Sequence, residues 1–209
     1  MTQDSFFIVL DGVDGSGTTT HSQLLASFLE YNGFKVYLTH EPSKNEIGKL
    51  IRNFLKNKKI PPTTDALLFA ADRDLHYHNE IKKKLAEGYI VISDRYIESS
   101  IIYQSVQSAD ISIDWIKELN KFVGLPELTI ILDIDSKLAI ARKNEKELEK
   151  FEDSSFLDKV RDLYLSRAKQ EGYYIINTND IIEFVQEKIQ KLVLEKLEIS
   201  KVKKYNSKT

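Results

Sequence analysis

The sequence predicts an α/β protein with a doubly wound, mainly parallel five-stranded sheet flanked by helices. Short apolar segments alternate with longer segments whose apolar residues recur at helical spacing. This alternation is typical of strand–helix–strand units with right-handed crossovers. Residues 89–93 and 128–133 are almost entirely apolar, as expected for strands buried on both faces of a parallel sheet.

The same patterns assign each element in order. Strands are expected at residues 6–10, 34–39, 89–93, 128–133 and 173–177. Helices are expected at residues 18–31, 46–58, 63–87 with Thr63 or Thr64 as N-cap, 97–107, 112–123, 136–171 with a charged interruption at 143–153, and 181–197. Because no repeat or linker divides the chain, we expect one domain over residues 1–209, ending in a flexible tail at about 198–209.

Composition narrows the class of function. Lys and Arg total 30 against 32 Asp and Glu, so no net positive charge favours nucleic acid or an anionic membrane. The chain has no cysteine, which excludes disulfides and thiolate chemistry. No apolar run reaches the roughly 20 residues that span a bilayer, and a strand close to the N-terminus leaves no room for a signal peptide. We expect a cytoplasmic protein with no membrane or nucleic-acid partner.

A glycine-rich segment follows the first expected strand and precedes the first expected helix. In this setting the backbone N–H groups of a loop and a helix N-terminus bind phosphate. The spacing of Gly12 and Gly17 fits a phosphate-binding loop, and Thr19 fits its magnesium-binding hydroxyl, but Thr18 occupies the lysine position. The alternative is ordinary turn chemistry of Asp-Gly and Ser-Gly pairs. The candidate phosphate-binding residues are Gly12, Val13, Asp14, Gly15, Ser16, Gly17, Thr18, Thr19 and Thr20.

Two further groups of residues carry candidate chemistry. Asp94 ends a buried strand, where it could hold magnesium, and Arg95 beside it could grip a phosphate; the alternative is a strand-end salt bridge. Phe69 and Arg73 are four residues apart and share one helix face, as a stacking ring and a donor to a base would. The alternative is a core phenylalanine beside an arginine that reaches out to solvent.

With these residues assembled, the chain resembles the thymidylate kinases, members of the P-loop nucleoside monophosphate kinase group. The resemblance extends from Phe7 to about Leu197. Its most specific part is Asp94-Arg95-Tyr96 followed by Ser99 and Tyr103-Gln104. The other motifs are the Asp-containing loop, Glu41-Pro42, Ile47-Gly48, Ile51-Arg52, Leu67-Leu68-Phe69, Arg73, Leu132-Asp133, Arg142, Phe156, Val160-Arg161 and Tyr164.

The resemblance implies the P-loop fold and transfer of the γ-phosphoryl of ATP to dTMP with Mg²⁺, in an enzyme that is usually a homodimer. Thr19 and Asp94, singled out above by the loop pattern and the strand end, are the expected ligands of that metal. The resemblance also implies a substrate site in which Phe69 stacks on thymine, Arg73 bonds the base and Arg95 holds the phosphate. Asp14, Ser100, Tyr103 and Gln104 complete that implied site. On the same basis the candidate catalytic residues are Asp14, Asp94, Arg95, Arg142 and Lys150.

The missing lysine leaves three functions open. Arg142 and Lys150 lie in an expected lid at about residues 141–153 and could supply the charge, with Lys44 as a second source; alternatively these charges form a solvated face. The first hypothesis is a dTMP kinase. The second is a kinase for another pyrimidine monophosphate such as dUMP, and the third is a nucleotide-binding protein that has lost catalysis. Glu41 is expected either in the site or as a carboxylate that organises the fold.

Overall fold

The computed structural model describes residues 5–56, 60–142 and 154–206, and in this part of the chain it confirms the predicted fold class. All strands of the five-stranded sheet are parallel, in the order β2-β3-β1-β4-β5. The strands are β1 Phe6–Gly12, β2 Val36–His40, β3 Ile90–Asp94, β4 Leu128–Asp133 and β5 Tyr174–Asn177. The described helices are α1 Thr18–Tyr31, α2 Glu46–Leu55, α3 Pro62–His76, η1 Tyr77–Ile81, α4 Lys82–Ala86, α5 Ile97–Gln107, α6 Ile113–Leu119, α7 Ser136–Arg142, α8 Ser154–Glu171 and α9 Ile182–Asn206.

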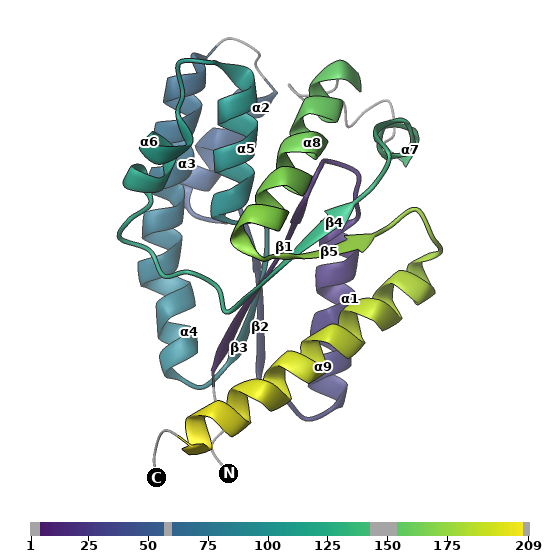
Figure 1. The fold of residues 1–209 in the computed structure, drawn as a ribbon. Helices are drawn as coiled ribbons and strands as arrows, with labels where there is room; N and C mark the ends of the chain where they lie inside the picture. The colour runs from purple at the N-terminus through teal and green to yellow at the C-terminus, as the bar shows by residue number, and fades with distance from the viewer. Residues whose placement is uncertain (1–4, 57–59, 143–153, 207–209) are drawn as a thin grey trace.

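Helices cover both faces of the sheet (Figure 1). Side chains of β1 point alternately to the two faces, as in any strand. Phe7 and Val9 join a core with α5 and α8, whereas Ile8 and Leu10 join a second core with α1 and α9. The sheet is therefore buried on both sides. Among the described residues, no helix has the length and apolar composition needed to cross a membrane.

Local patterns predict some boundaries correctly and others wrongly. The predicted bounds of α1, α5 and β4 are confirmed. The expected cap at Thr63 or Thr64 is wrong, because the helix already begins at Pro62, whose fixed φ suits a first helical position. A π-helical turn, η1, separates α3 from α4.

The C-terminal helix differs most from its prediction. It continues to Asn206 instead of ending at residue 197, so it enters the segment that was expected to be a flexible tail. Residues 198–206 contain neither glycine nor proline, and no helix-breaking residue stops the helix there. Most of the expected lid, residues 143–153, lies outside the described residues.

The phosphate-loop glycine Gly15 packs against the backbone of α7. Its φ is +88°, and a Cβ placed on it would lie 2.5 Å from the carbonyl oxygen of Ala139. Gly33 has a similar φ of +82°, but a Cβ there would meet nothing within 4 Å. An alanine at either position would therefore meet the same backbone penalty from its positive φ, but only at Gly15 would its Cβ also clash with a neighbouring atom.

We predict that Gly15→Ala lowers the free energy of unfolding by about 1–3 kcal/mol more than Gly33→Ala, the usual cost of overpacking. Urea unfolding of both variants measures this difference. Equal losses would show that α7 moves aside at no cost.

His21 of α1 is buried against α9. Its Nδ1 lies 2.8 Å from Oε1 of Gln186, and the imidazole is 3% exposed. Burial, together with the nearby positive charge of Arg142, lowers the pKa of His21 even though the bond to Gln186 opposes this shift. The folded protein therefore takes up a proton at His21 less readily than the unfolded chain, whose histidines titrate near pH ~6.5.

We predict that the contribution of His21 to the free energy of unfolding is fully present above pH ~6.5. It decreases as the pH falls below that value, because the unfolded chain binds the proton first. His21→Gln should reduce this loss between pH 7.5 and pH 5.5, as measured by urea unfolding. His78→Gln, at a half-exposed position on η1, is the control for removing a histidine. If His21→Gln leaves the slope unchanged, another group causes the pH dependence.

Candidate active site

The predicted phosphate loop forms the turn between β1 and α1. Gly15 and Gly17 both have positive φ, at 88° and 92°, a conformation that glycine adopts at little cost. Helix α1 begins at Thr18, and no side chain caps its N-terminus. The first N–H groups of α1 therefore have no capping side chain, as in anion-binding helix N-termini. Thr18 itself is only 6% exposed.

Asp94 ends β3 beside this loop. The hydroxyl of Thr19 donates to Oδ2 of Asp94 at 2.5 Å, so the two residues expected to hold magnesium are in contact. Oδ1 of Asp94 is buried and has no hydrogen-bond partner among the described residues. Those residues contain no cluster of three or more His, Cys, Asp and Glu that could hold a metal. One carboxylate and one hydroxyl fit Mg²⁺, which usually takes its remaining ligands from phosphate and water.

Arg95 connects the loop to α5. Its Nη1 donates to the carbonyl of Gly12 at 2.8 Å and to the hydroxyl of Ser99 at 3.0 Å. Its Nη2 donates to Oδ1 of Asp14 at 2.5 Å. Burial alone would lower the pKa of Arg95, but the carboxylate of Asp14 and other nearby groups raise it well above its usual value. Arg95 is therefore a fixed cation, and its ion pair joins it to the loop.

Asp11 is a site residue that sequence reasoning missed. It is fully buried, and its carboxylate accepts hydrogen bonds from N–H of Gly12, N–H of Tyr96, N–H and hydroxyl of Ser99, and hydroxyl of Tyr164. Burial raises the pKa of Asp11, against the opposing effects of Arg95 and these donors. An acidic residue next to the last position of an apolar strand is the only sequence signal of this role.

Arg73 is buried, and the alternative in which it reaches out to solvent is wrong. It is 1% exposed. Nε donates to Oε2 of Glu41 at 2.7 Å and Nη1 to Oδ1 of Asn120 at 2.7 Å. Nη2 donates to the carbonyl of Tyr96 at 3.1 Å and to the hydroxyl of Ser100 at 2.9 Å. Four of its five N–H groups are thus used within the protein.

Glu41 organises this buried region. Oε2 accepts from Arg73, and Oε1 lies 3.2 Å from Nδ1 of His76. The other ring nitrogen of His76 lies 2.7 Å from the hydroxyl of Thr39. Glu41 also lines the cavity described below, so both of its expected roles apply.

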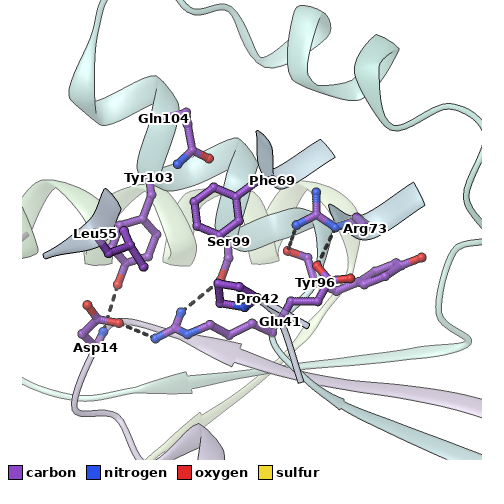
Figure 2. Close-up of a pocket in the computed structure, with 11 residues that line it drawn as sticks. Asp14, Glu41, Pro42, Leu55, Phe69, Arg73, Tyr96, Ser99, Tyr103 and Gln104 are labelled. Carbon is purple, nitrogen blue, oxygen red and sulfur yellow. Dashed lines mark hydrogen bonds and ion pairs between the residues drawn. The ribbon is translucent and has the colours of Figure 1, made fainter. Parts of the chain in front are cut away.

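A cavity of about 110 Å³ lies between the phosphate loop and helices α3 and α5. Figure 2 shows Gln104 at one end and Asp14 at the other, with the ring of Tyr103 between them. The hydroxyl of Tyr103 accepts a hydrogen bond from N–H of Asp14 at 2.9 Å. Oε1 of Gln104 is buried without a partner among the described residues. The lining residues are Asp14, Glu41, Pro42, Leu55, Phe69, Arg73, Arg95, Tyr96, Ser99, Tyr103 and Gln104.

The structure brings together most of the predicted substrate residues. Ser100 does not line the cavity, but it bonds Arg73, which does. Sequence reasoning missed Leu55 as a lining residue, and it had no signal beyond the helical spacing of an ordinary core residue.

Of the two residues expected to replace the charge of the loop lysine, only Arg142 is among the described residues. Arg142 is exposed at the end of α7, and its Nη2 donates to the carbonyl of Thr178 at 2.8 Å. It is close enough to α1 to lower the pKa of His21. Lys150 lies outside the described residues. Lys44, the second candidate, is exposed in the loop after β2.

Comparison with known proteins places the chain in a family. A family model described as thymidylate kinase matches residues 10–189. A probable thymidylate kinase of Pyrobaculum aerophilum is 47% identical over 189 residues, covering 90% of this chain and 95% of that protein. Its counterpart in Pyrobaculum calidifontis is 50% identical over 173 residues, covering 82% of this chain and 86% of that protein. A probable thymidylate kinase of Caldivirga maquilingensis is 40% identical over 204 residues, covering 96% of this chain and 98% of that protein. The chain belongs to the thymidylate kinase family.

Proposed function

We propose that this protein transfers the γ-phosphoryl of ATP to dTMP, giving dTDP. Family membership supports the reaction class. The observation that carries the assignment is the ion pair between Asp14 and Arg95, which joins a phosphate-type loop directly to a cavity lined by an aromatic ring and a buried amide. A donor site and an acceptor site therefore meet at one pair of residues.

The cavity has groups that suit thymine. Phe69 offers a ring for stacking, which is worth about 0.5–1.5 kcal/mol for aromatic pairs. The unpaired Oε1 of Gln104 can accept from the imide N–H of the base. The remaining N–H of Arg73 can donate to a base carbonyl. Tyr103, fixed by its bond to Asp14, would crowd a 2′-hydroxyl and so favour deoxyribose.

Arg95 is placed to hold the acceptor phosphate. Three of its five N–H groups bond Gly12, Ser99 and Asp14, and no acceptor for the others is found within the described residues. Such a cation aligns the acceptor phosphate and stabilises charge on the transferring group, which is most of what phosphoryl transfer requires. Mg²⁺, held by Thr19 and Asp94 together with the phosphates, would neutralise further charge when bound.

Assembly and compartment complete the proposal. We infer a homodimer in the cytoplasm, the arrangement implied by the resemblance to the family and compatible with a chain that has no cysteine. Light scattering of the purified protein tests the dimer, for which a monomer mass would be a contradiction.

The base assignment predicts that dTMP is phosphorylated faster than dUMP and much faster than purine monophosphates, measured as kcat/KM in a steady-state assay with ATP and Mg²⁺. Gln104→Leu should lower kcat/KM for dTMP by about 10- to 100-fold, since the lost hydrogen bond is worth about 1–3 kcal/mol. Gln107→Leu, on the same helix but outside the cavity, is the control. A preference for a purine would overturn the pocket assignment. Binding of dTMP without turnover would indicate a protein that has lost catalysis.

The metal assignment predicts that Asp94→Asn and Thr19→Val each raise the Mg²⁺ concentration needed for half-maximal activity. The amide and the apolar side chain are poorer ligands than a carboxylate and a hydroxyl. Thr19→Ser keeps the hydroxyl and should behave almost like the unchanged protein. Identical Mg²⁺ titrations for all of these variants would place the metal elsewhere.

Arg142 is proposed to supply charge that Thr18 cannot. Removing one positioned donor to a transition state costs about 2.7–4 kcal/mol, so Arg142→Ala should lower kcat by about 100- to 1,000-fold with little change in the Kd of dTMP. Adding Thr18→Lys to this variant should restore part of the loss. If Arg142→Ala leaves kcat unchanged, the charge comes from another residue, with Lys150 the next to test.

A further inference from the structure

A second cavity, of about 400 Å³, lies beside the acceptor site and has no part in the proposed reaction. It is bounded by α5, by α6 and the segment that follows it, and by α8. Its volume falls within the range of small-molecule sites, roughly 300–1,000 Å³. Val9, Ile101 and Val123 give it apolar walls, and each of these side chains is at most 9% exposed.

One wall of this cavity is polar. Its arginine, Arg167, keeps an unused N–H donor, whereas both carboxylate oxygens of Glu98 already accept hydrogen bonds. Arg167 is 3% exposed. Its Nε and Nη2 bond the carboxylate of Glu98 at 2.6 and 2.8 Å, and Nη2 also reaches Glu171 at 3.1 Å. The hydroxyl of Tyr173 donates to Glu98 as well, at 2.9 Å. No partner for Nη1 of Arg167 is found among the described residues.

Two lysines add positive charge at the same wall. Lys117 and Lys121 both line the cavity. Lys117 bonds Glu171 at 3.1 Å, and Lys121 bonds Glu118. Each of these ammonium groups uses one of its three N–H donors in the printed bonds. Together with Nη1 of Arg167, the wall therefore keeps N–H donors that a carboxylate in the cavity can accept from.

The wall between the two cavities consists of residues that hold Arg73. Tyr96 lines both cavities. Its carbonyl accepts from Arg73, and its ring lies 5.5 Å from the guanidinium carbon. Asn120 lines the second cavity and accepts from Arg73 at 2.7 Å. An occupant of the second cavity would therefore contact two of the groups that orient Arg73 in the first.

We propose that the second cavity is a regulatory site for a small aromatic monoanion, such as an aryl carboxylate. Its ring would lie on the apolar wall, and its carboxylate would bind Arg167, Lys117 and Lys121. Occupancy would immobilise Tyr96 and Asn120, and would thereby tighten binding of the acceptor nucleotide at Arg73. The coupling rests on the proposed function, whereas the site itself does not.

The site is tested first, by calorimetric titration of the full chain with naphthalene-2-carboxylate in the absence of nucleotides. Naphthalene-2-carboxamide, a neutral probe of similar shape, should bind at least tenfold more weakly. Lys121→Met should weaken carboxylate binding about three- to tenfold. Lys49→Met removes a similar exposed ion pair between residues three apart on α2 and should have no effect. Equal affinity for the two probes, or equal effects of the two lysine variants, would overturn the site.

Removal of the buried cation provides a second test. Arg167→Gln alone would leave Glu98 buried without its partner, so it is combined with Glu98→Gln, which leaves a neutral pair. The double variant, checked for an unchanged melting transition, should lose the preference for carboxylate over carboxamide. A preserved preference would show that Arg167 does not bind the anion.

The coupling is tested separately, by measuring the Kd of dTMP with and without saturating naphthalene-2-carboxylate. We expect at least threefold tighter dTMP binding in its presence. Asn120→Ala should abolish this change at full probe occupancy, which is set from the probe Kd measured for that variant. The fluorescence of Trp115, the only tryptophan in the chain and part of α6, reports probe binding independently. An unchanged dTMP Kd at full probe occupancy would overturn the coupling but leave the proposed function standing.

Discussion

The candidate active site depends on the buried carboxylate of Asp11. It lies near the end of β1 and accepts hydrogen bonds from groups that begin the phosphate loop, begin α5 and belong to α8. Helix α5 has no capping side chain of its own, and Asp11 performs that task from a neighbouring strand. The positive end of the helix dipole and the N–H donors oppose the cost of burying the charge, although burial still raises the pKa of Asp11. One carboxylate thus fixes the loop and α5 relative to each other.

This arrangement explains how Arg95 can adopt an unfavourable backbone conformation. Its φ is +70°, the only positive value at a non-glycine residue among those described, and such a residue costs of order 1–3 kcal/mol. Backbone bonds on both sides offset the strain: N–H of Arg95 donates to the carbonyl of Leu10, and its carbonyl accepts from the hydroxyl of Ser93. In return the guanidinium is directed at the loop, where it meets Gly12 and Asp14.

The sequence predicted what depends on local pattern and missed what depends on distant partners. The bounds of α1 follow from its apolar spacing and from Gly33 after its end, and the strand-end position of Asp94 follows from the apolar run before it. The burial of Arg73 could not be predicted in this way, because its partners Glu41 and Asn120 lie 32 and 47 residues away in the sequence. Asp11 was missed for the same reason: apart from Gly12, its donors come from residues at least 85 positions away.

The ion pair between Asp14 and Arg95 also bears on the absence of a lysine from the loop. With Thr18 in the lysine position, the described part of the loop carries no positive charge of its own, and Asp14 balances the charge of Arg95. In the proposed reaction an acceptor phosphate at the remaining N–H groups of Arg95 would repel the carboxylate of Asp14 and weaken its bond to the guanidinium, since like charges at one cation repel each other. The carboxylate of Asp14 would then accept a hydrogen bond from the sugar. The charge of Arg95 would then act on phosphate only after the acceptor has bound, so acceptor binding and charge stabilisation would be linked in one step.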